Sequence, residues 1–198
     1  MISALVVAAG LSSRMGRPKQ LLPYAGHTVI EHVVSVLVAS PVDEVLVVTG
    51  HKRAAVEAVL AKWPVRTVFN PGYAIQDMLS SLQVGLQATS TWSRAALLAL
   101  GDMPGIEGRT VAQLIQAYQT GGDKSLYVPS YQMHAGHPIL VPSRYWSAIL
   151  QLPPGDSLRS VVQSKDAHIQ WVTVGTPSIL RDLDTPADYA QELALRNK

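Results

Sequence analysis

The stretch LVVAAGLSSRMGRPKQ, residues 5–20, combines small residues with cations in a pattern that suits an anionic ligand. Its apolar run ends in Ala8, Ala9 and Gly10, whose small size would let a ligand approach the backbone N–H groups closely. Arg14 and Lys19 follow in the same loop and offer donors for phosphate oxygens. The pattern favours a phosphate-binding loop, although an ordinary turn with solvated charges has a similar composition.

Two better-known phosphate loops do not match this stretch. A P-loop has the form G-x-x-x-x-G-K-[ST], whereas here five residues separate Gly10 from Gly16, and arginine and proline follow. The dinucleotide fingerprint G-x-G-x-x-G is also absent from the sequence. A phosphate-binding loop at this position therefore belongs to a different class.

Acidic residues follow two further segments. Asp102 comes just after the apolar run AALLAL, so it should stand at the carboxyl edge of a parallel sheet, beside the first loop. Asp182 and Asp184 lie two apart, and on an extended segment they would face the same way. Such carboxylates suit a magnesium ion bound to a nucleotide. The alternatives are a turn-forming role for Asp102 and an N-cap role for Asp184.

Two histidines, His134 and His137, lie three apart in MHAGHPILV. Zinc binding is one interpretation, but no third ligand is evident in the sequence and no H-E-x-x-H is present. A pair of packed or surface histidines is the other interpretation.

The elements that must position these residues alternate along the chain. Short Val- and Leu-rich runs without alternating polarity predict strands covered on both faces, at residues 3–8, 44–49, 65–69 and 94–100. Segments with helical spacing separate them, at residues 28–39, 52–62, 78–89 and 108–120. This order predicts an α/β fold with a mostly parallel central sheet and helices on both sides.

The last third of the sequence is less regular. We expect strands at 125–129, 137–142 and 167–174, and short helices at 144–150 and 157–163. A final helix should span 185–196, with Asp184 or Thr185 as its N-cap. We expect one domain over 1–198, in which residues 121–198 wall off one side of a cleft formed with residues 1–120.

Composition excludes several function classes. The chain has 198 residues, of which 47% are hydrophobic and 15% charged, and a net charge of +2, so it suits a folded core and gives no reason to expect nucleic-acid binding. It has no cysteine, which excludes disulfides, thiolate metal sites and a cysteine nucleophile. No signal peptide or run of about 18 apolar residues is visible, so we expect a cytoplasmic protein without membrane segments.

The segment AAGLSSRMGRPKQLLPYAGHTVIEHV resembles the N-terminal signature of the MobA-like nucleotidyltransferases, and within them the molybdenum cofactor cytidylyltransferases. The resemblance implies a Rossmann-like, three-layer fold whose first loop wraps a nucleoside triphosphate. Gly10, Arg14 and Lys19 would contact its phosphates, and Ala8 and Ala9 would lie beside the base. Alanine at the position of Ala9 goes with CTP in these families, whereas glycine goes with GTP.

The same resemblance extends, more weakly, to later segments. Asp102 matches an aspartate that binds the metal, and the D-L-D-T-P segment matches another family motif, in which we favour Asp184 as the second metal ligand. Asn70 is a plausible polar contact at a strand end, and Ser80 and Ser81 match a segment near base and ribose. This segment departs from the family at Asp77, where glycine is usual.

The acceptor side has two further candidates by resemblance. His137 lies in a G-H-P motif, and Arg159 lies in a segment similar to G-D-x-G-[AS]-R, with Leu158 in place of the glycine. The G-H-P motif lines the acceptor side in the family, and Arg159 could meet the phosphate of an anionic pterin.

The reaction that the resemblance implies is a magnesium-dependent transfer of CMP from CTP to the terminal phosphate of a molybdopterin-type cofactor. Arg14, Lys19 and Asp102 would act as catalytic residues, and a molybdenum hydroxylase could receive the product. Three alternatives stay open: a transferase with another acceptor, such as a sugar or isoprenoid phosphate, or with GTP; a non-catalytic cofactor chaperone; and an oxidoreductase.

Overall fold

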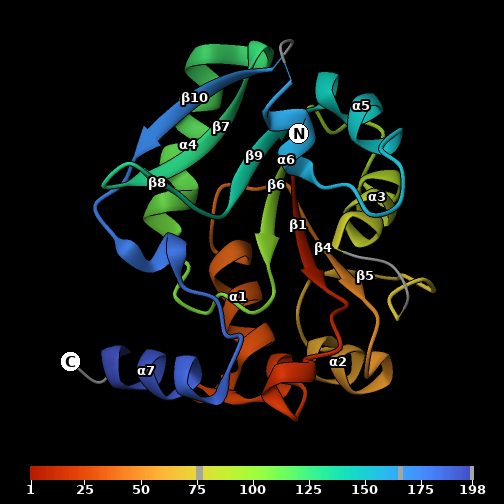
Figure 1. Cartoon of the computed structure of the whole chain (residues 1–198), viewed down its shortest axis with the longest axis vertical. Coiled ribbons are helices and arrows are strands. Elements are labelled where there is room, and N and C mark those ends of the chain that lie inside the picture. Colours follow the sequence, from red (N-terminus) through yellow and green to blue (C-terminus); the bar gives the residue numbers. More distant parts are fainter. Residues whose placement is uncertain (75–77, 165–166, 197–198) are drawn as a thin grey trace.

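The computed structural model describes residues 1–74, 78–164 and 167–196 of the chain. Its central sheet has the strand order β10-β7-β9-β6-β1-β4-β5, and β8 pairs with β7 at one end. Neighbouring strands run parallel except where β9 pairs with β6 and β7, and where β8 pairs with β7. The expected mostly parallel sheet is confirmed, and the arrows of β1, β4 and β6 in Figure 1 point to one edge.

The strands of the main sheet alternate with helices in the first half of the chain. Their bounds are β1 Ile2–Ala8, β4 Glu44–Thr49, β5 Arg66–Phe69, β6 Ala95–Leu100, β7 Ser125–Tyr131, β8 His134–Ala135, β9 Ile139–Pro142 and β10 His168–Thr173. A separate two-stranded sheet comprises β2 Pro23–Tyr24 and β3 His27–Thr28. The α-helices of the described residues are α1 Val29–Val38, α2 Arg53–Leu60, α3 Met78–Ala88, α4 Gly108–Gly121, α5 Trp146–Leu150, α6 Leu158–Val162 and α7 Pro186–Arg196.

Helices cover both faces of the sheet because successive strand residues point to opposite sides. Along β1, Ala4 and Val6 pack in a core cluster with residues of α1, α2 and α4. Leu5 packs in a second cluster with residues of α3, α5 and α6. All three side chains are fully buried, as the unbroken apolar run predicts for a strand between two layers.

The strand and helix ranges expected from the sequence are confirmed to within a few residues. The main difference lies at β9, which begins at Ile139 and not at His137, whose N–H donates to the Ile179 carbonyl oxygen at 3.0 Å. At α2, Lys52 has φ 55° and so lies outside the helix. The short β2–β3 hairpin and β8 are strands that no local pattern in the sequence indicated.

A third, smaller cluster joins segments that lie far apart in the sequence. Met15 of the first loop, Tyr24 of β2 and Leu183 of the acidic segment are all nearly fully buried and pack together. Figure 1 shows α7, which follows this segment, at the edge toward which β1 and β6 point. The cluster therefore fixes the first loop against the segment that carries Asp182 and Asp184.

Among the described residues, none of the helices has the length and apolar character needed to cross a membrane.

Candidate active site

The first loop and the loop after β6 emerge side by side because β1 and β6 are parallel neighbours. The Gly101 N–H donates to the Val7 carbonyl oxygen at 2.9 Å, which extends the pairing one residue beyond β6. A Cβ at Gly101 would lie 2.9 Å from the Ala8 Cβ, so only glycine fits this approach without movement. Asp102 consequently starts its loop directly beside the end of β1.

Three carboxylates converge at this edge. One oxygen from each of Asp102, Asp182 and Asp184 lies within 4.8 Å of the others. Leu183 explains the arrangement, because its N–H donates to the Asp102 carbonyl oxygen at 3.0 Å and its side chain is buried in the third cluster. With Leu183 turned inward, the aspartates on either side face outward together, as their spacing predicts.

Asp184 is not the cap of α7. The Asp188 N–H donates to Thr185 Oγ1 at 3.3 Å, and the Thr185 N–H donates to Asp188 Oδ2 at 2.7 Å, which is a reciprocal capping arrangement. Thr185 therefore fills the N-cap role, one of the two assignments that the sequence left open. The Asp184 carboxylate is left to pair with cations of the first loop.

Two cations of the first loop reach the carboxylates. The Lys19 ammonium group makes an ion pair with Asp102, and its Nζ lies 3.2 Å from Asp184 Oδ1. Arg14 Nη2 lies 2.7 Å from Asp184 Oδ2. The Lys19 side chain is only 12% exposed, whereas that of Arg14 is 71% exposed. Lys19 is therefore the inner cation of the site and Arg14 the outer one.

The charges of the cluster act on one another. Burial lowers the pKa of Lys19, but the Asp102 and Asp184 carboxylates outweigh it, so the pKa is raised and the ammonium form is favoured. Partial desolvation and the neighbouring Asp184 and Asp102 carboxylates raise the pKa of Asp182. At Asp182, repulsion from the other two carboxylates is stronger than attraction to the Lys19 ammonium group. Such a balance is expected of a site that accepts further positive charge.

The first loop keeps a fixed shape through its own polar contacts. Ser12 adopts φ 56°, its Oγ accepts from the Lys19 N–H at 3.2 Å, and it donates to Gln20 Oε1 at 3.3 Å. Gly16, with φ 67°, ends the short 3-10 turn Ser13–Met15. A Cβ at Gly10 would meet nothing within 4 Å, so the space beside this residue is open. Gly10 was predicted as a ligand contact, whereas the role of Ser12, whose hydroxyl group bonds across the loop, was not predicted.

The small residues at the end of β1 are both buried. Ala8 and Ala9 are each 1% exposed, and the Ala9 carbonyl oxygen accepts from the His51 N–H at 3.1 Å. A Cβ at Gly50 would lie 2.6 Å from this oxygen, so the backbones at the ends of β1 and β4 lie close together. This packing fixes the direction in which the first loop leaves the sheet.

Asn70, Ser80 and Ser81 are brought together by the fold. Asn70 is 1% exposed, and its Nδ2 donates to the hydroxyl oxygens of both serines, each at 2.9 Å. Its Oδ1 accepts from the Gly72 N–H at 2.9 Å. These bonds tie the end of β5 to the first turn of α3. Asp77, the departure from the family pattern, lies outside the described residues.

The two acceptor-side candidates lie on different elements. His137 is half-buried. Burial lowers the pKa of its imidazole below the usual value, and the Asp182 carboxylate opposes this shift without reversing it. Arg159 is exposed on α6, whose apolar residues pack in the second cluster with α5. His134 is exposed, and its Nδ1 lies 2.9 Å from the Gln132 carbonyl oxygen. Within the described residues, the cluster of three potential metal ligands is the aspartate group and does not include these histidines.

The comparison with known families decides the assignment at the level of the family. Residues 4–169 match the family model described as the MobA-like NTP transferase domain. The chain belongs to this family. The resemblance seen in the first loop therefore extends over most of the chain, and the family is one of nucleotidyltransferases.

Two curated proteins are similar to this chain over nearly its whole length. Nicotine blue oxidoreductase of Paenarthrobacter nicotinovorans is 30% identical over 190 residues, which cover 93% of this chain and 92% of that protein. Molybdenum cofactor cytidylyltransferase of Escherichia coli K12 is 28% identical over 189 residues, covering 95% and 93%. The chain is thus about equally similar in sequence to an oxidoreductase and to a transferase.

Solved structures show the same fold. A nucleotidyl transferase from Methanothermobacter thermautotroptrophicus superimposes with a TM-score of 0.87 at 28% identity, covering 100% of this chain and 99% of that one. A Mycobacterium tuberculosis protein solved as a complex with manganese gives a TM-score of 0.81 at 27% identity, covering 98% of each chain. The three-layer nucleotidyltransferase fold is thereby confirmed.

Proposed function

We propose that this protein transfers CMP from CTP to the terminal phosphate of a molybdopterin-type cofactor and releases pyrophosphate. The observation that carries the proposal is the meeting of Lys19 with Asp102 and Asp184 at the carboxyl edge of the sheet. A cationic loop suits the phosphates of a nucleoside triphosphate, and a carboxylate cluster in contact with that loop suits the accompanying divalent cation. The similarity to the Escherichia coli cytidylyltransferase supports the choice of nucleotide and acceptor.

The first loop would bind the triphosphate. Gly10 leaves open space beside its backbone, which suits close approach by phosphate oxygens. Lys19 and Arg14 would turn from Asp102 and Asp184 to the β- and γ-phosphates and stabilise the charge of the leaving pyrophosphate. Ala8 and Ala9 would lie beside the base, and Ala9 would select CTP.

The three aspartates suit a divalent cation such as Mg²⁺. Hard cations prefer carboxylate oxygens, and Asp102, Asp182 and Asp184 present one each within 4.8 Å. A cation held there would supply charge neutralisation at the phosphates. We propose Asp102 and Asp184 as the principal ligands, with Asp182 as an additional one because it is the most exposed of the three.

Nucleotidyl transfer needs no nucleophilic side chain on this chain. A phosphate oxygen of the acceptor attacks the α-phosphorus of CTP, and the bond from that phosphorus to the bridging oxygen breaks. The bonding electrons leave with pyrophosphate. The residues of the site therefore contribute orientation and electrostatic stabilisation, which are the main terms in phosphoryl-group transfer.

The remaining candidates are assigned to the nucleoside and to the acceptor. We propose that Asn70, Ser80 and Ser81 support the segment beside base and ribose, because their mutual hydrogen bonds fix that segment. His137 and Arg159 would face the acceptor phosphate. In this arrangement residues 1–120 supply most of the nucleotide site, residues 121–198 supply the acceptor side, and a molybdenum hydroxylase would receive the product.

The test is pyrophosphate release with molybdenum cofactor as acceptor, offering CTP, GTP, ATP and UTP separately, each with and without Mg²⁺. Release with CTP that requires both metal and acceptor is the expected result. Release with GTP would contradict the role of Ala9 and leave the enzyme class intact. Tight cofactor binding without release would indicate a chaperone. Redox turnover of nicotine blue, without any pyrophosphate release, would point to the activity named for the Paenarthrobacter relative.

A further inference from the structure

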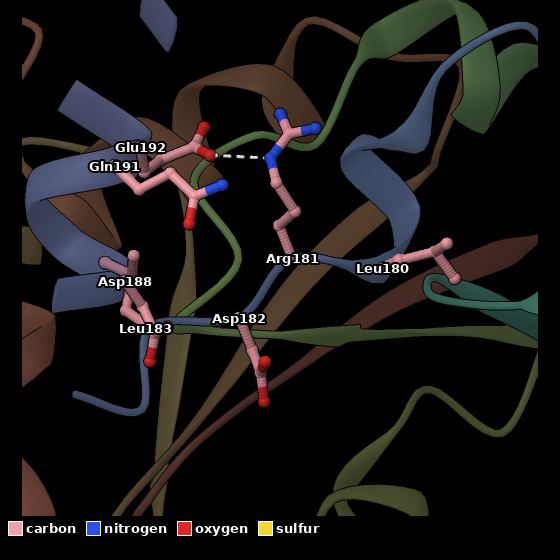
Figure 2. A pocket seen from close by; sticks show the side chains of 7 residues that line it. All are labelled: Leu180, Arg181, Asp182, Leu183, Asp188, Gln191 and Glu192. Carbon is pink, nitrogen blue, oxygen red and sulfur yellow. Dashed lines mark hydrogen bonds and ion pairs between the residues drawn. The ribbon is translucent and has the colours of Figure 1, made fainter. Parts of the chain in front are cut away.

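The residue before Asp182 points away from the carboxylate cluster. Figure 2 shows the Arg181 side chain extending toward α7 while Asp182 points to the other side of the segment. Arg181 Nε lies 2.8 Å from Glu192 Oε2, so the guanidinium group ties the acidic segment to α7. Alternation along an extended segment couples the two directions, because a rotation that moves Arg181 also moves Asp182.

Glu192 is a buried carboxylate shared by two partners. The residue is 5% exposed, and its second oxygen, Oε1, accepts from the Tyr24 hydroxyl group at 3.1 Å. Burial, together with the Glu192 carboxylate, raises the pKa of Tyr24 to about 12, so the phenol stays a neutral donor at ordinary pH. Glu192 thus links the acidic segment, α7 and β2.

The same ion pair also touches the loop that carries Asp102. A Cβ at Gly105 would lie 2.9 Å from Glu192 Oε1 and 3.2 Å from Arg181 Nη2, so the bare backbone of Gly105 packs on the pair. Gly105 follows Asp102 by only a few residues. The Arg181–Glu192 pair therefore lies against the loop that carries Asp102 as well as in the segment that carries Asp182 and Asp184.

Apolar packing does not fill the space between this segment and α7. A polar cavity of about 140 Å³ lies there, lined by Arg181, Asp182, Gln191 and Glu192 among others (Figure 2). A buried ion pair adds little net stability compared with apolar residues of similar size, because both charges lose their hydration. Orientation of the segment is thus the larger effect expected of this pair.

Of the three aspartates, Asp182 depends most on the orientation of its own segment. Within the described parts of the chain, ion pairs join Lys19 to Asp102 and Asp184, and Arg14 to Asp184, but none joins either cation to Asp182. The position of Asp182 therefore depends strongly on its chain neighbours, Arg181 and Leu183. A change at Arg181 would therefore reach Asp182 first.

We propose that the Arg181–Glu192 ion pair, with Tyr24, is the positioning device that holds Asp182 and Asp184 at the correct distance from Asp102 and so sets the affinity for the divalent cation. The inference rests on the proposed function, because it assumes that the three aspartates bind metal. Glu192, Arg181 and Tyr24 are positioning residues, since they act through the carboxylates and do not touch the substrates.

The test is direct measurement of Mn²⁺ binding, by the electron paramagnetic resonance signal of the free ion, on the full chain alone and with CTP but no acceptor. Glu192→Gln keeps the size of the side chain and removes the charge. We expect its Mn²⁺ affinity to fall about tenfold, the usual effect of losing a residue that orients a metal ligand. The affinity for CTP without metal should change little, because Glu192→Gln leaves Arg14 and Lys19 of the first loop unaltered.

Two further variants separate positioning from general stability. Glu44→Gln is the matched control, because Glu44 also joins an arginine, Arg66 (3.2 Å), and a serine hydroxyl group, but at the amino ends of the strands. Its Mn²⁺ affinity should equal that of the wild type. Arg181→Met combined with Glu192→Met removes both charges, so the melting temperature should recover while the Mn²⁺ affinity stays about tenfold weaker.

The possible outcomes are distinct. Unchanged Mn²⁺ affinity in folded Glu192→Gln would overturn the inference and leave the proposed function standing. If Glu192→Gln does not fold, the double variant decides, and recovery of affinity together with stability would overturn the positioning role. A wild-type protein that binds no Mn²⁺, with or without CTP, would overturn both the inference and the proposed metal site.

Discussion

Lys19 and Asp102 form an ion pair across the gap between the first loop and the loop after β6, at the point where the proposed cation would bind. The Lys19 ammonium group thereby supplies positive charge to the carboxylates in the absence of a metal ion. A divalent cation and Lys19 should compete for the same oxygens, and triphosphate should relieve the competition by drawing Lys19 away.

Lys19→Met should therefore tighten Mn²⁺ binding to the protein without nucleotide, although it removes a residue needed for turnover. Loss of one positive charge beside two carboxylates should raise the affinity roughly tenfold, equivalent to about 1.4 kcal/mol. Titration with Mn²⁺ in the absence of CTP measures this. Lys62→Met is the control, because Lys62 pairs with Glu31 instead (2.8 Å). Weaker Mn²⁺ binding by Lys19→Met than by the control would contradict the competition.

Asp102→Asn should lower turnover by a hundredfold or more, since the loss of one strong electrostatic contact in the transition state costs about 3–4 kcal/mol. The fold should survive, because the Asp102 backbone carbonyl oxygen, which accepts from Leu183, is unchanged. Rates of pyrophosphate release and melting temperature are the two measurements. Asp123→Asn, which alters an exposed aspartate bonded to the Tyr118 hydroxyl group, should leave the rate unchanged. Full Mg²⁺-dependent activity in Asp102→Asn would remove this residue from the metal site.

Gly10→Ala should weaken CTP binding without loss of stability, whereas Gly101→Ala should lower stability. The added Cβ meets open space at Gly10, so the melting temperature should not change, but CTP affinity should fall roughly tenfold because a ligand can no longer approach the backbone. At Gly101 the Cβ meets Ala8 at 2.9 Å, and the strain should cost about 1–3 kcal/mol of stability. Thermal unfolding and CTP titration of both variants check this. Normal CTP binding by Gly10→Ala would argue against phosphate contact there.

Glu31 should make stability dependent on pH in the acid range. Burial disfavours its charge, but hydrogen bonds from Lys62 and Thr28 prevail and lower the pKa of Glu31 to about 2. Because the folded-state pKa lies below the ordinary value of 4.5, ionised Glu31 stabilises the fold above about pH 4.5, and this contribution is lost as the pH falls toward 2. Glu31→Gln should cost about 1 kcal/mol at pH 7, because the neutral amide loses the charge-assisted contact with Lys62. Urea unfolding of both proteins from pH 7 to pH 2 should show the difference shrinking, and a constant difference would refute this assignment.

Local patterns in the sequence account for much of the fold and for the carboxylates that meet at the edge of the sheet. Continuous apolar runs and helical spacing correctly indicate the strands and helices around β1 and β6, because burial on two faces leaves a direct mark on residue types. The two-residue spacing of Asp182 and Asp184 correctly predicts a shared direction. The placement of Asp102 beside the first loop follows from the parallel arrangement of the strands.

Other features depend on contacts that no local pattern records. Lys19 and Asp184 are 165 positions apart in the sequence, and their ion pair exists only because Leu183 packs on Met15 and Tyr24. The pair between Arg181 and Glu192 links the acidic segment to α7, and in the sequence either residue alone would be taken for a surface charge. The role of Asp184 could not be separated from capping until the bonds of Thr185 were known.

The distance along the chain between Lys19 and Asp184 also has a consequence for biosynthesis. During synthesis the first loop and the strands from β1 to β9 are made well before the aspartate pair, so they can form while the pair is still missing. The carboxylate cluster closes only when Leu183 reaches Met15, so a translation product halted before that point would carry Arg14 and Lys19 without their counter-ions.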